Sequence, residues 1–387
     1  MKKDNQQSAL IALTAAAIML QGASKKVEAS TFEPDTTFDY KYSKYSEGSM
    51  PADKVAIGSV DRYNIDIHQF KFKTPISEDT EISVSGVQEA MSGASPWYIL
   101  PDANGKAIQV MSGATIEESR SEISGDFHSY NKNSDSTLSL SYSQENDYKS
   151  FGFGYSGSFQ FNQKETTIDY GINTTKDYIN AVDADIYTTR PLEQTKDRLG
   201  VVLGFSQVLT KNTLVGVSFG YTALHGFLSD AYKLAYVNGE YLQDSRPDTH
   251  NQASITLMLR QFFPSANAAL HFDYRRFTSD WGIDSDTVEL AWYQNIGEGW
   301  QLIPSIRHYQ QTKAEFYKPF YLQTRKDGYY SSDYRLSEFS SNSGSIKLAK
   351  KFDKFTINIS YESYDASGDN PGLISYQFYS LGLGYKF

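Results

Sequence analysis

Two histidines frame the part of the chain whose residue types could do chemistry. His225 and His250 flank a polar segment that also holds Asp230, Asp244 and Arg246. Imidazoles grouped with carboxylates can bind a metal ion or activate a water molecule. Their spacing matches no ligand motif, however, and charges solvated in a loop explain the same residues. We therefore expect no enzyme, and a rim hydrolase is the weakest of the functions considered below.

A second charged group follows at 275–284. Arg276, Asp280 and Asp284 lie close in sequence to Trp281. An arginine can bind a carboxylate through two parallel hydrogen bonds, and such a pair would rigidify a turn. We predict an ion-pair network of Arg276, Asp280 and Asp284 at the rim of the molecule. A site for an anion or for a partner is the alternative.

The composition excludes several other chemistries. The 387 residues include no cysteine, which rules out disulfides, cysteine-ligated metals and thiol catalysis. The chain contains no phosphate-binding loop, dinucleotide-binding glycine pattern or haem motif, so we predict no cofactor and no metal site. Its formal net charge of -10 argues against a nucleic-acid partner, because nucleic-acid binding depends on basic residues.

The first residues have the pattern of a secretory signal peptide. A basic start precedes an apolar stretch from Ala9 to Leu20, and small residues lead to a cleavage site after Ala29. A cytoplasmic N-terminal helix is the alternative. We predict that 1–29 is a signal peptide and that 30–387 is a single domain.

Beyond residue 30, large apolar side chains recur at every second position, which is the period of a β-strand. Clear examples are Phe151-Phe153-Tyr155 and Leu199-Val201-Leu203. About 16 such strands can be counted, within a range of roughly 14–18. Short polar turns alternate with long loops, the longest lying at roughly 89–115, 174–196, 224–248 and 313–333. The alternation predicts an all-β fold: a transmembrane up-and-down antiparallel barrel with short periplasmic turns and long outer loops.

The final segment, YSLGLGYKF, supports the same fold. Its large side chains alternate with small or polar ones up to Phe387. Such a strand closes a membrane barrel and faces lipid, whereas a secreted sandwich or β-helix predicts loops of similar length at both ends. We predict that Tyr385 and Phe387 form the signal read by the barrel-insertion machinery. The expected surroundings are the lipids of the outer membrane of a Gram-negative bacterium.

If the alternating apolar residues face lipid, their neighbours face the lumen. The lipid-facing set then includes Tyr63, Ile65 and Ile67. The predicted lumen is mainly acidic on the earlier strands and carries arginines on the later ones. Its members are Asp66, His68, Glu81, Glu122, Asp126, His128, Asp169, Arg198, Arg260, His271, Asp273, Arg275 and Arg307. Opposed charges would orient polar solutes in a pore, and the alternative is internal salt bridges that fill the barrel.

The long stretch 89–115 is unusually apolar for an outer loop, because it contains Pro96, Trp97 and Tyr98. It could fold inward as a constriction, cover the mouth of the barrel or bind a partner. A plain surface loop is the simplest interpretation.

Several phrases of the second half resemble a family of uncharacterised bacterial outer-membrane proteins, a domain-of-unknown-function family. The phrases are LSDAYK (228–233), RPDTHNQ (246–252), ALHFDYRRFTSDWGI (269–283), VELAWYQ (288–294) and SSDYRLSEF (331–339). The resemblance runs from about residue 120 to the C-terminus and implies a barrel of this size. It also implies genes encoded nearby for a small exported lipoprotein, a thioredoxin-like protein and a flavin transferase. It assigns no catalytic residue.

The sequence therefore supports two other functions more strongly than a hydrolase. The size of the barrel and the split charge of its wall favour a channel or transport pore for small solutes. The resemblance and the apolar loop favour a sleeve or export conduit for a small exported lipoprotein or redox protein.

Overall fold

A computed structural model describes residues 32, 35–112, 116–182 and 184–387. The predicted signal peptide, 1–29, lies outside these described residues. No helix in the described ranges is long and apolar enough to cross a membrane. The helical elements there are short 3₁₀ turns: η1 (Ala52–Lys54), η2 (Asn162–Lys164), η3 (Pro264–Ala266) and η4 (Tyr334–Leu336).

Sixteen antiparallel strands close into one barrel, which confirms the predicted fold and strand number. Each strand pairs with its neighbour in the chain, and β21 (Ser375–Lys386) closes on β1 (Thr37–Glu47) with Phe38 opposite Tyr385. The others, in order, are β3 (Asn64–Pro75), β4 (Thr80–Gly93), β7 (Ile116–Asn131), β8 (Ser134–Gln144), β9 (Tyr148–Phe161), β10 (Thr166–Ile179), β11 (Gln194–Thr210), β12 (Thr213–Gly226), β15 (Thr249–Phe263), β16 (Ala268–Ser279), β17 (Asp284–Asn295), β18 (Trp300–Gln311), β19 (Phe339–Lys351) and β20 (Phe355–Ser367). Closure satisfies every strand edge within the sheet, as a spanning structure requires.

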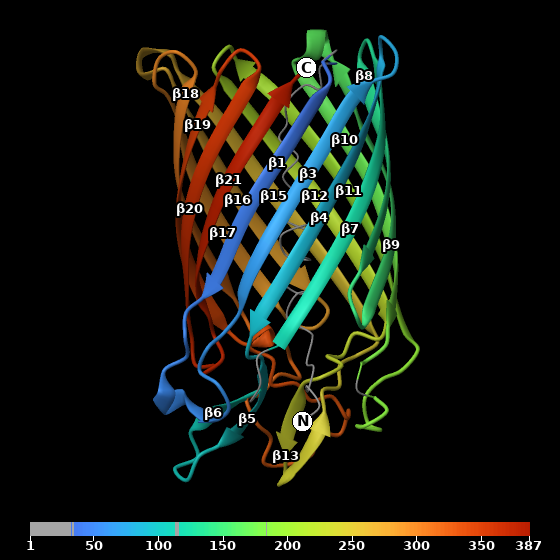
Figure 1. Ribbon diagram of the computed structural model, residues 1–387, viewed down its shortest axis with the longest axis vertical. Coiled ribbons are helices and arrows are strands. Elements are labelled where there is room, and N and C mark those ends of the chain that lie inside the picture. The colour runs from blue at the N-terminus through green and yellow to red at the C-terminus, as the bar shows by residue number, and fades with distance from the viewer. Residues whose placement is uncertain (1–31, 33–34, 113–115, 183) are drawn as a thin grey trace.

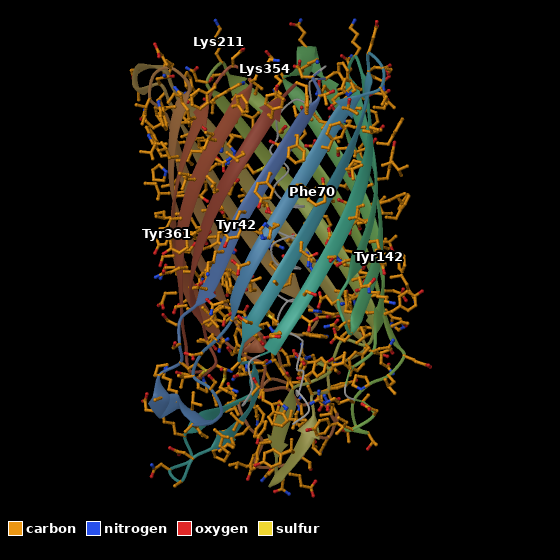
Figure 2. All side chains as sticks on the ribbon, viewed as in Figure 1. Tyr42, Phe70, Tyr142, Lys211, Lys354 and Tyr361 are labelled. Atoms are coloured by element: carbon orange, nitrogen blue, oxygen red, sulfur yellow. The ribbon has the colours of Figure 1, made fainter. Side chains whose placement is uncertain are left out.

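The two ends of the barrel differ (Figure 1). At the short-turn end, brief turns join the strands and the C-terminus lies among them. Figure 2 places Lys211 and Lys354, from two of these turns, at that end. At the loop end, the strands are joined by the long segments 48–63, 94–115, 180–193, 227–248 and 312–338. Short turns face the periplasm and long loops face the exterior in outer-membrane barrels, so the loop end is the outer mouth.

Aliphatic and aromatic side chains cover the outside of the wall. Leu203, Phe219 and Ile306 are typical, with 54%, 50% and 64% of their surface exposed. Side chains that lie opposite each other on paired strands share a face, so each pair extends the same apolar surface. Nearer the loop end, the outward side chains become polar, as with His308 and its hydrogen-bond partner Asn342. The apolar band therefore occupies the part of the wall nearer the short turns.

The predicted facing of one strand is wrong. Phe70 and Phe72 of β3 are exposed on the outer wall, whereas Ile65 is buried inside at 4% exposure. The strand carries apolar residues at both parities, so periodicity alone chose the wrong one. Asp66 and His68 consequently lie on the outer face, not in the lumen. Both polar side chains have hydrogen-bond partners on the outer face. Asp66 accepts a hydrogen bond from the Tyr42 hydroxyl, and His68 shares one with the Tyr40 hydroxyl.

Two small sheets lie outside the barrel at its loop end (Figure 1). One contains β2 (Val55–Ile57), β6 (Ala107–Met111) and β5 (Pro96–Pro101), and the other is the hairpin of β13 (Leu234–Val237) and β14 (Glu240–Gln243). Contacts join β5 to β13. The long loops therefore have a folded structure of their own.

Candidate functional site

The inner wall of the barrel carries most of the residues that the sequence placed there. The strand registers put all the predicted lumen residues except Asp66 and His68 on the inner face. They are Glu81, Glu122, Asp126, His128, Asp169, Arg198, Arg260, His271, Asp273, Arg275 and Arg307. Each alternates with outward residues such as Ile82, Phe127 or Phe272, so the period of the strand fixes its side.

The acidic side of this wall lies on β4 and β7–β10. Near the short turns, His128 bridges two carboxylates, with Nδ1 3.7 Å from Glu81 Oε1 and Nε2 3.3 Å from Asp135 Oδ2. Asp126 accepts hydrogen bonds from the hydroxyls of Ser83 (2.9 Å) and Ser139 (2.7 Å). These polar contacts hold the carboxylates in place along the wall.

Nearer the outer mouth, Arg120 organises a second acidic group that the sequence reasoning missed. Its Nε lies 2.9 Å from Glu89 Oε2 and its Nη1 3.0 Å from Glu122 Oε2. Arg120 shares the parity of Glu122, and that spacing was the signal that could have found it. One arginine between two carboxylates leaves this side of the wall acidic.

The basic side is formed mainly by strands β11–β19. Arg260 makes a bidentate pair with Asp273, with Nη2 2.8 and 2.9 Å from the two carboxylate oxygens. Arg198, Arg275 and Arg307 differ from Arg260. In the described part of the chain, none of these three guanidinium groups lies within ion-pairing distance of a carboxylate, and the Nε of each is buried without a hydrogen bond. Glu289 lies opposite Arg307 and Asp177 interacts electrostatically with Arg198, but neither carboxylate lies within ion-pairing distance of the arginine. The basic side therefore presents cations without a direct ion-pair partner in the described wall.

Lysines extend the basic side around the ring. Lys41 on β1, Lys71 on β3 and Lys347 on β19 all point inward. The sequence reasoning missed them because it looked mainly for charges beside the most apolar runs. Their parity, opposite to Tyr40, Phe70 and Ile346, was the available signal. The lumen thus has a mainly acidic arc on β4–β10. The remaining strands form an arc that is basic on balance, although Asp39, Asp273, Glu289 and Glu362 also point inward there.

The long loops pack together across the outer mouth, and we call the packed segments 48–63, 94–112, 227–248, 280–283, 312–338 and 368–374 the cap. Trp281 belongs to one apolar cluster with Phe316 and Leu336, although it comes from the segment 280–283 and they come from loop 312–338. Val237 and Tyr321 belong to another that joins loop 227–248 to loop 312–338. These loops start from different parts of the ring, so their meeting covers the lumen.

Buried ion pairs tie the centre of the cap together. The side chain of Asp333 is fully buried, with Arg246 Nη2 3.0 Å from its Oδ2. Arg335 Nε lies 2.9 Å from the same carboxylate. Arg335 Nη2 also reaches Asp230 Oδ2 at 3.2 Å, and Arg246 Nε reaches Asp244 Oδ1 at 2.7 Å. Two guanidinium groups thus share one carboxylate, and each binds a second.

Electrostatics favour the charged form of this central carboxylate. Burial raises the pKa of Asp333, but the positive charges of Arg335, Lys233 and Arg246 outweigh burial and hold that pKa well below its usual range. Burial lowers the pKa of Lys233, and the negative charge of Asp333 opposes the change. The cap is therefore locked by ionised groups that stabilise one another.

The apolar stretch with Pro96, Trp97 and Tyr98 belongs to the cap. It contacts loop 227–248 through Lys233 Nζ to Pro96 O (2.8 Å), Trp97 Nε1 to Tyr232 O (3.1 Å) and the rings of Tyr98 and Tyr241 (centroids 4.9 Å apart). These contacts place the stretch in the cap at the outer mouth, beside loop 227–248. Binding of an exported lipoprotein or redox protein here stays a prediction.

A second polar link joins the cap to the acidic arc. Tyr232 donates its hydroxyl proton to Asp147 Oδ2 at 2.6 Å, across to the turn between β8 and β9. Burial raises the pKa of Asp147 to about 7, although the Tyr232 hydroxyl opposes the change. Burial and the charge of Asp147 raise the pKa of Glu145 to about 8. These two carboxyl groups titrate near neutral pH at the edge of the cap.

The two histidines of the candidate rim group lie apart, on opposite faces of the wall. His225 lies on the outer face of β12, whereas His250 lies on the inner face of β15 and stacks on Trp281 with centroids 3.8 Å apart. Asp230 and Asp244 instead belong to the buried ion pairs of the cap. In the described ranges, no group of three or more His, Asp or Glu side chains could hold a metal ion.

The rim network forms in part. Arg276 Nη2 lies 2.8 Å from Asp284 Oδ2, as predicted, and its Nη1 lies 2.8 Å from Asp286 Oδ2. Asp280 does not join them, because it accepts hydrogen bonds from the backbone and the side-chain amide of Asn251. Both pairs lie on the outer face, and the side chains of Arg276 and Asp284 are about two-fifths exposed, so the pairs support the rim without entering the lumen.

A closed ring of sixteen strands with an apolar outer band defines an outer-membrane β-barrel protein, located in the outer membrane of a Gram-negative bacterium. The chain belongs to the family described as "Protein of unknown function (DUF3570)", whose model matches residues 10–382. No curated protein matches the sequence.

Solved structures similar to this chain are outer-membrane barrels. A bacterial polysaccharide outer-membrane secretin aligns with a TM-score of 0.53 and 8% identity over 92% of this chain and 100% of its own. The monoaromatic hydrocarbon channel CymD aligns with a TM-score of 0.43 and 10% identity, over 100% of this chain and 94% of its own. The siderophore receptor PirA from Pseudomonas aeruginosa aligns with a TM-score of 0.42 and 10% identity, over 87% of this chain. This chain spans 57% of the length of PirA.

Proposed function

We propose that this barrel is a channel for small polar solutes whose basic arc favours anions, and that the cap controls entry. The observation that carries the proposal is the set of inward guanidinium groups, those of Arg198, Arg275 and Arg307, that have no carboxylate of the described wall within ion-pairing distance. Arg275 on β16 lies opposite Thr287 on β17, which in turn lies opposite Tyr309 on β18. Arg307 is the next inward residue of β18, so the two arginines lie at nearly the same height of the wall. A barrel of about 16 strands leaves an aqueous lumen unless something plugs it.

Charge on the wall explains why such groups would be useful. An unpaired cation next to a low-dielectric wall is costly unless water or a passing anion solvates it. Facing an acidic arc, it creates a transverse field that orients dipolar solutes. Anionic and dipolar small molecules therefore fit this lumen better than neutral apolar ones.

The cap sets the second condition for passage. Its loops cross the outer mouth, so a solute must pass between them or wait for them to open. Opening breaks the contacts of Asp333 with two arginines, which are central to the cap. We therefore assign selectivity to the lumen and gating to the cap.

The test is single-channel conductance of the refolded protein in planar bilayers. Arg275→Ala combined with Arg307→Ala should shift the reversal potential toward cations, because positive charge leaves the lumen. Arg276→Ala is the matched control, since Arg276 is the next residue in the chain but points outward. It should leave selectivity unchanged. An equal shift in both variants contradicts the proposal. So does a folded barrel that stays silent even when the cap is weakened by Asp333→Ala.

A further inference from the structure

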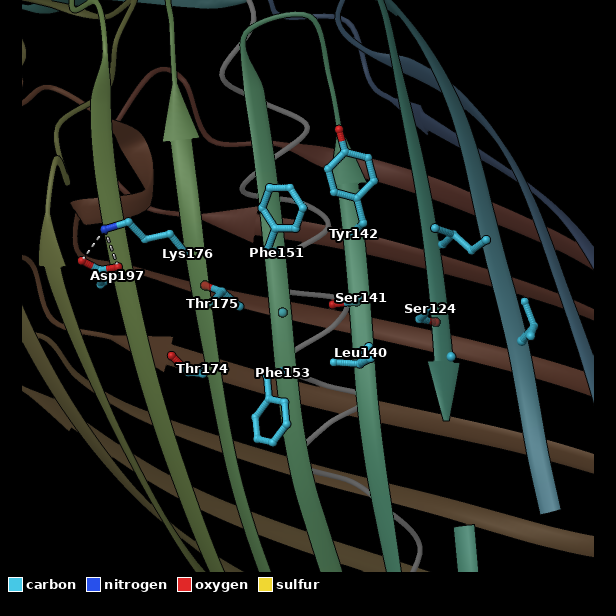
Figure 3. A pocket seen from close by; sticks show the side chains of 14 residues that line it. Ser124, Leu140, Ser141, Tyr142, Phe151, Phe153, Thr174, Thr175, Lys176 and Asp197 are labelled. Carbon is cyan, nitrogen blue, oxygen red and sulfur yellow. Dashed lines mark hydrogen bonds and ion pairs between the residues drawn. The ribbon is translucent and has the colours of Figure 1, made fainter. Parts of the chain in front are cut away.

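The outer wall of β7–β11 carries a groove that faces away from the lumen. Figure 3 shows its walls, and its volume is about 660 Å³. Ile123, Leu140 and Phe153 line it with outward apolar side chains that are 54%, 59% and 45% exposed. Tyr142 and Phe151 stand nearer the loop end, with ring centroids 4.8 Å apart. An aromatic and aliphatic groove thus opens sideways, toward the membrane.

The groove exists because two outward positions lack large side chains. Gly125 on β7 has the parity of Ile123 and Phe127, and a Cβ there would meet only the carbonyl oxygen of Ser83, at 3.9 Å. Thr174 on β10 is the second small residue. Most outward positions at this height carry large residues, so the wall is indented here.

Charged groups stand at the loop end of the groove. Lys176 Nζ lies 2.9 Å from Asp197 Oδ1, as Figure 3 shows. Lys149 on β9 also points outward and is exposed, directly opposite Tyr178 and diagonal to Lys176. In the described part of the chain Lys149 has no ion-pair partner. Two lysines against one carboxylate leave a net positive charge above an apolar groove.

We propose that this groove binds a lipid of the outer leaflet, with an acyl chain between Leu140 and Phe153 and a phosphate of the headgroup on Lys149 and Lys176. Three observations select this occupant. The wall lies in the outer membrane, so lipid already contacts it. The groove lies on the half of the strands nearer the outer mouth. Its positive end matches the negative charge of a phosphorylated headgroup.

The binding mode follows from simple chemistry. A groove lets an acyl chain contact protein on several sides, and aromatic walls offer a large contact area for each methylene. The lysines also attract the negative phosphate, and they attract a zwitterionic headgroup, which has no net charge, less strongly. This inference does not depend on the proposed channel function.

The experiment is native mass spectrometry of the refolded barrel in detergent with added diphosphoryl lipid A. We expect one lipid to stay bound to the wild-type protein. Gly125→Phe fills the groove and should weaken binding at least about tenfold, which is the loss expected from displacing roughly two buried methylenes. Gly344→Phe is the matched control: Gly344 is also outward, on distant β19, where a Cβ would meet only Ser305 O at 4.0 Å. It should bind lipid like the wild type.

Further variants separate the headgroup from the chain. Lys149→Gln with Lys176→Gln should lower binding of lipid A but hardly change binding of phosphatidylethanolamine, and Lys44→Gln, an outward lysine on β1, should change neither. If Gly125→Phe fails to fold, Thr174→Leu fills the same groove from β10. Equal lipid binding by the wild-type and the filled variants overturns the proposal. A wild-type dimer that a filled groove converts to monomers also overturns it, because a second copy would then be the occupant.

Discussion

The most informative change lies at the centre of the cap, at Asp333. Replacing it with alanine removes the carboxylate that Arg246 and Arg335 share, at 3.0 and 2.9 Å. Both guanidinium groups keep a second partner, Asp244 or Asp230, but lose their common one. Lys233, also buried, loses a neighbouring negative charge. The variant therefore leaves excess positive charge inside the cap.

The size of the effect follows from that geometry. Removing one partner of a buried ion pair costs about 3–5 kcal/mol, because the remaining charge stays buried and uncompensated. Each factor of ten in an equilibrium constant corresponds to about 1.4 kcal/mol. The fraction of time that the cap is open should therefore rise by roughly a hundredfold to a few thousandfold. The barrel itself should keep its stability, because the side-chain ion pairs of Asp333 in the described part of the chain go to Arg246 and Arg335 of the cap.

Limited trypsin digestion measures this opening. Lys233 is buried in the closed cap, so cleavage after it requires the cap to open. Asp333→Ala should speed this cleavage strongly. Asp327→Ala is the control in the same loop, because Asp327 forms an exposed pair with Arg325 worth about 0–1 kcal/mol. If Asp333→Ala digests no faster than the control, the ion pairs do not hold the cap and the reasoning fails.

Three further predictions concern the cap and the wall. The raised pKa values of Asp147 and Glu145 mean that protonation stabilises the cap, so this stability is full below about pH 4 and is lost as pH rises through 7–8. Channel open probability should rise over that interval, and Asp147→Asn with Glu145→Gln should flatten the change. Trp97→Ala should weaken the cap by about 2–3 kcal/mol through lost packing and one hydrogen bond, and trypsin should again report it. The chain has no cysteine, so a spin label can be attached to a single introduced one. A label at His68→Cys should contact lipid-soluble oxygen more than a label at Ile67→Cys, because residues 68 and 67 lie on opposite faces of β3.

The barrel could be predicted from the sequence because its rule is local. Alternation of large apolar residues sets both the strand and its face, and short polar turns separate the strands. Asp126, Arg198 and Arg275 could be assigned to the inner face because the large apolar residues nearest to them, Phe127, Leu199 and Tyr274, all fall at the opposite parity of the strand. In β3 the apolar residues fall at both parities, Ile65 at one and Phe70 at the other, so alternation alone allows either face to point outward. The register of β3 is fixed by pairing with β1, which no local pattern reveals.

The cap could not be predicted, because its contacts join loops that are distant in sequence. Arg246 and Asp333 are 87 residues apart, and Trp97 and Tyr232 are 135 apart. Asp230 and Asp244 looked like solvated charges or metal ligands for the same reason. Each is a strong donor or acceptor whose partner lies on another loop, so residue type alone gave no sign of burial.

The ionic centre of the cap also bears on its use as a gate. Well-packed apolar residues often stabilise a buried site as well as ion pairs do, so stability alone does not explain three carboxylates and two arginines there. An apolar interface exposes hydrophobic surface to water whenever it opens, and that exposure costs free energy in proportion to its area. Charged groups regain hydration on opening, which offsets part of the lost attraction. An interface built on Asp333 and its arginines is thus specific when closed and can open into water at lower cost than an apolar one of the same size.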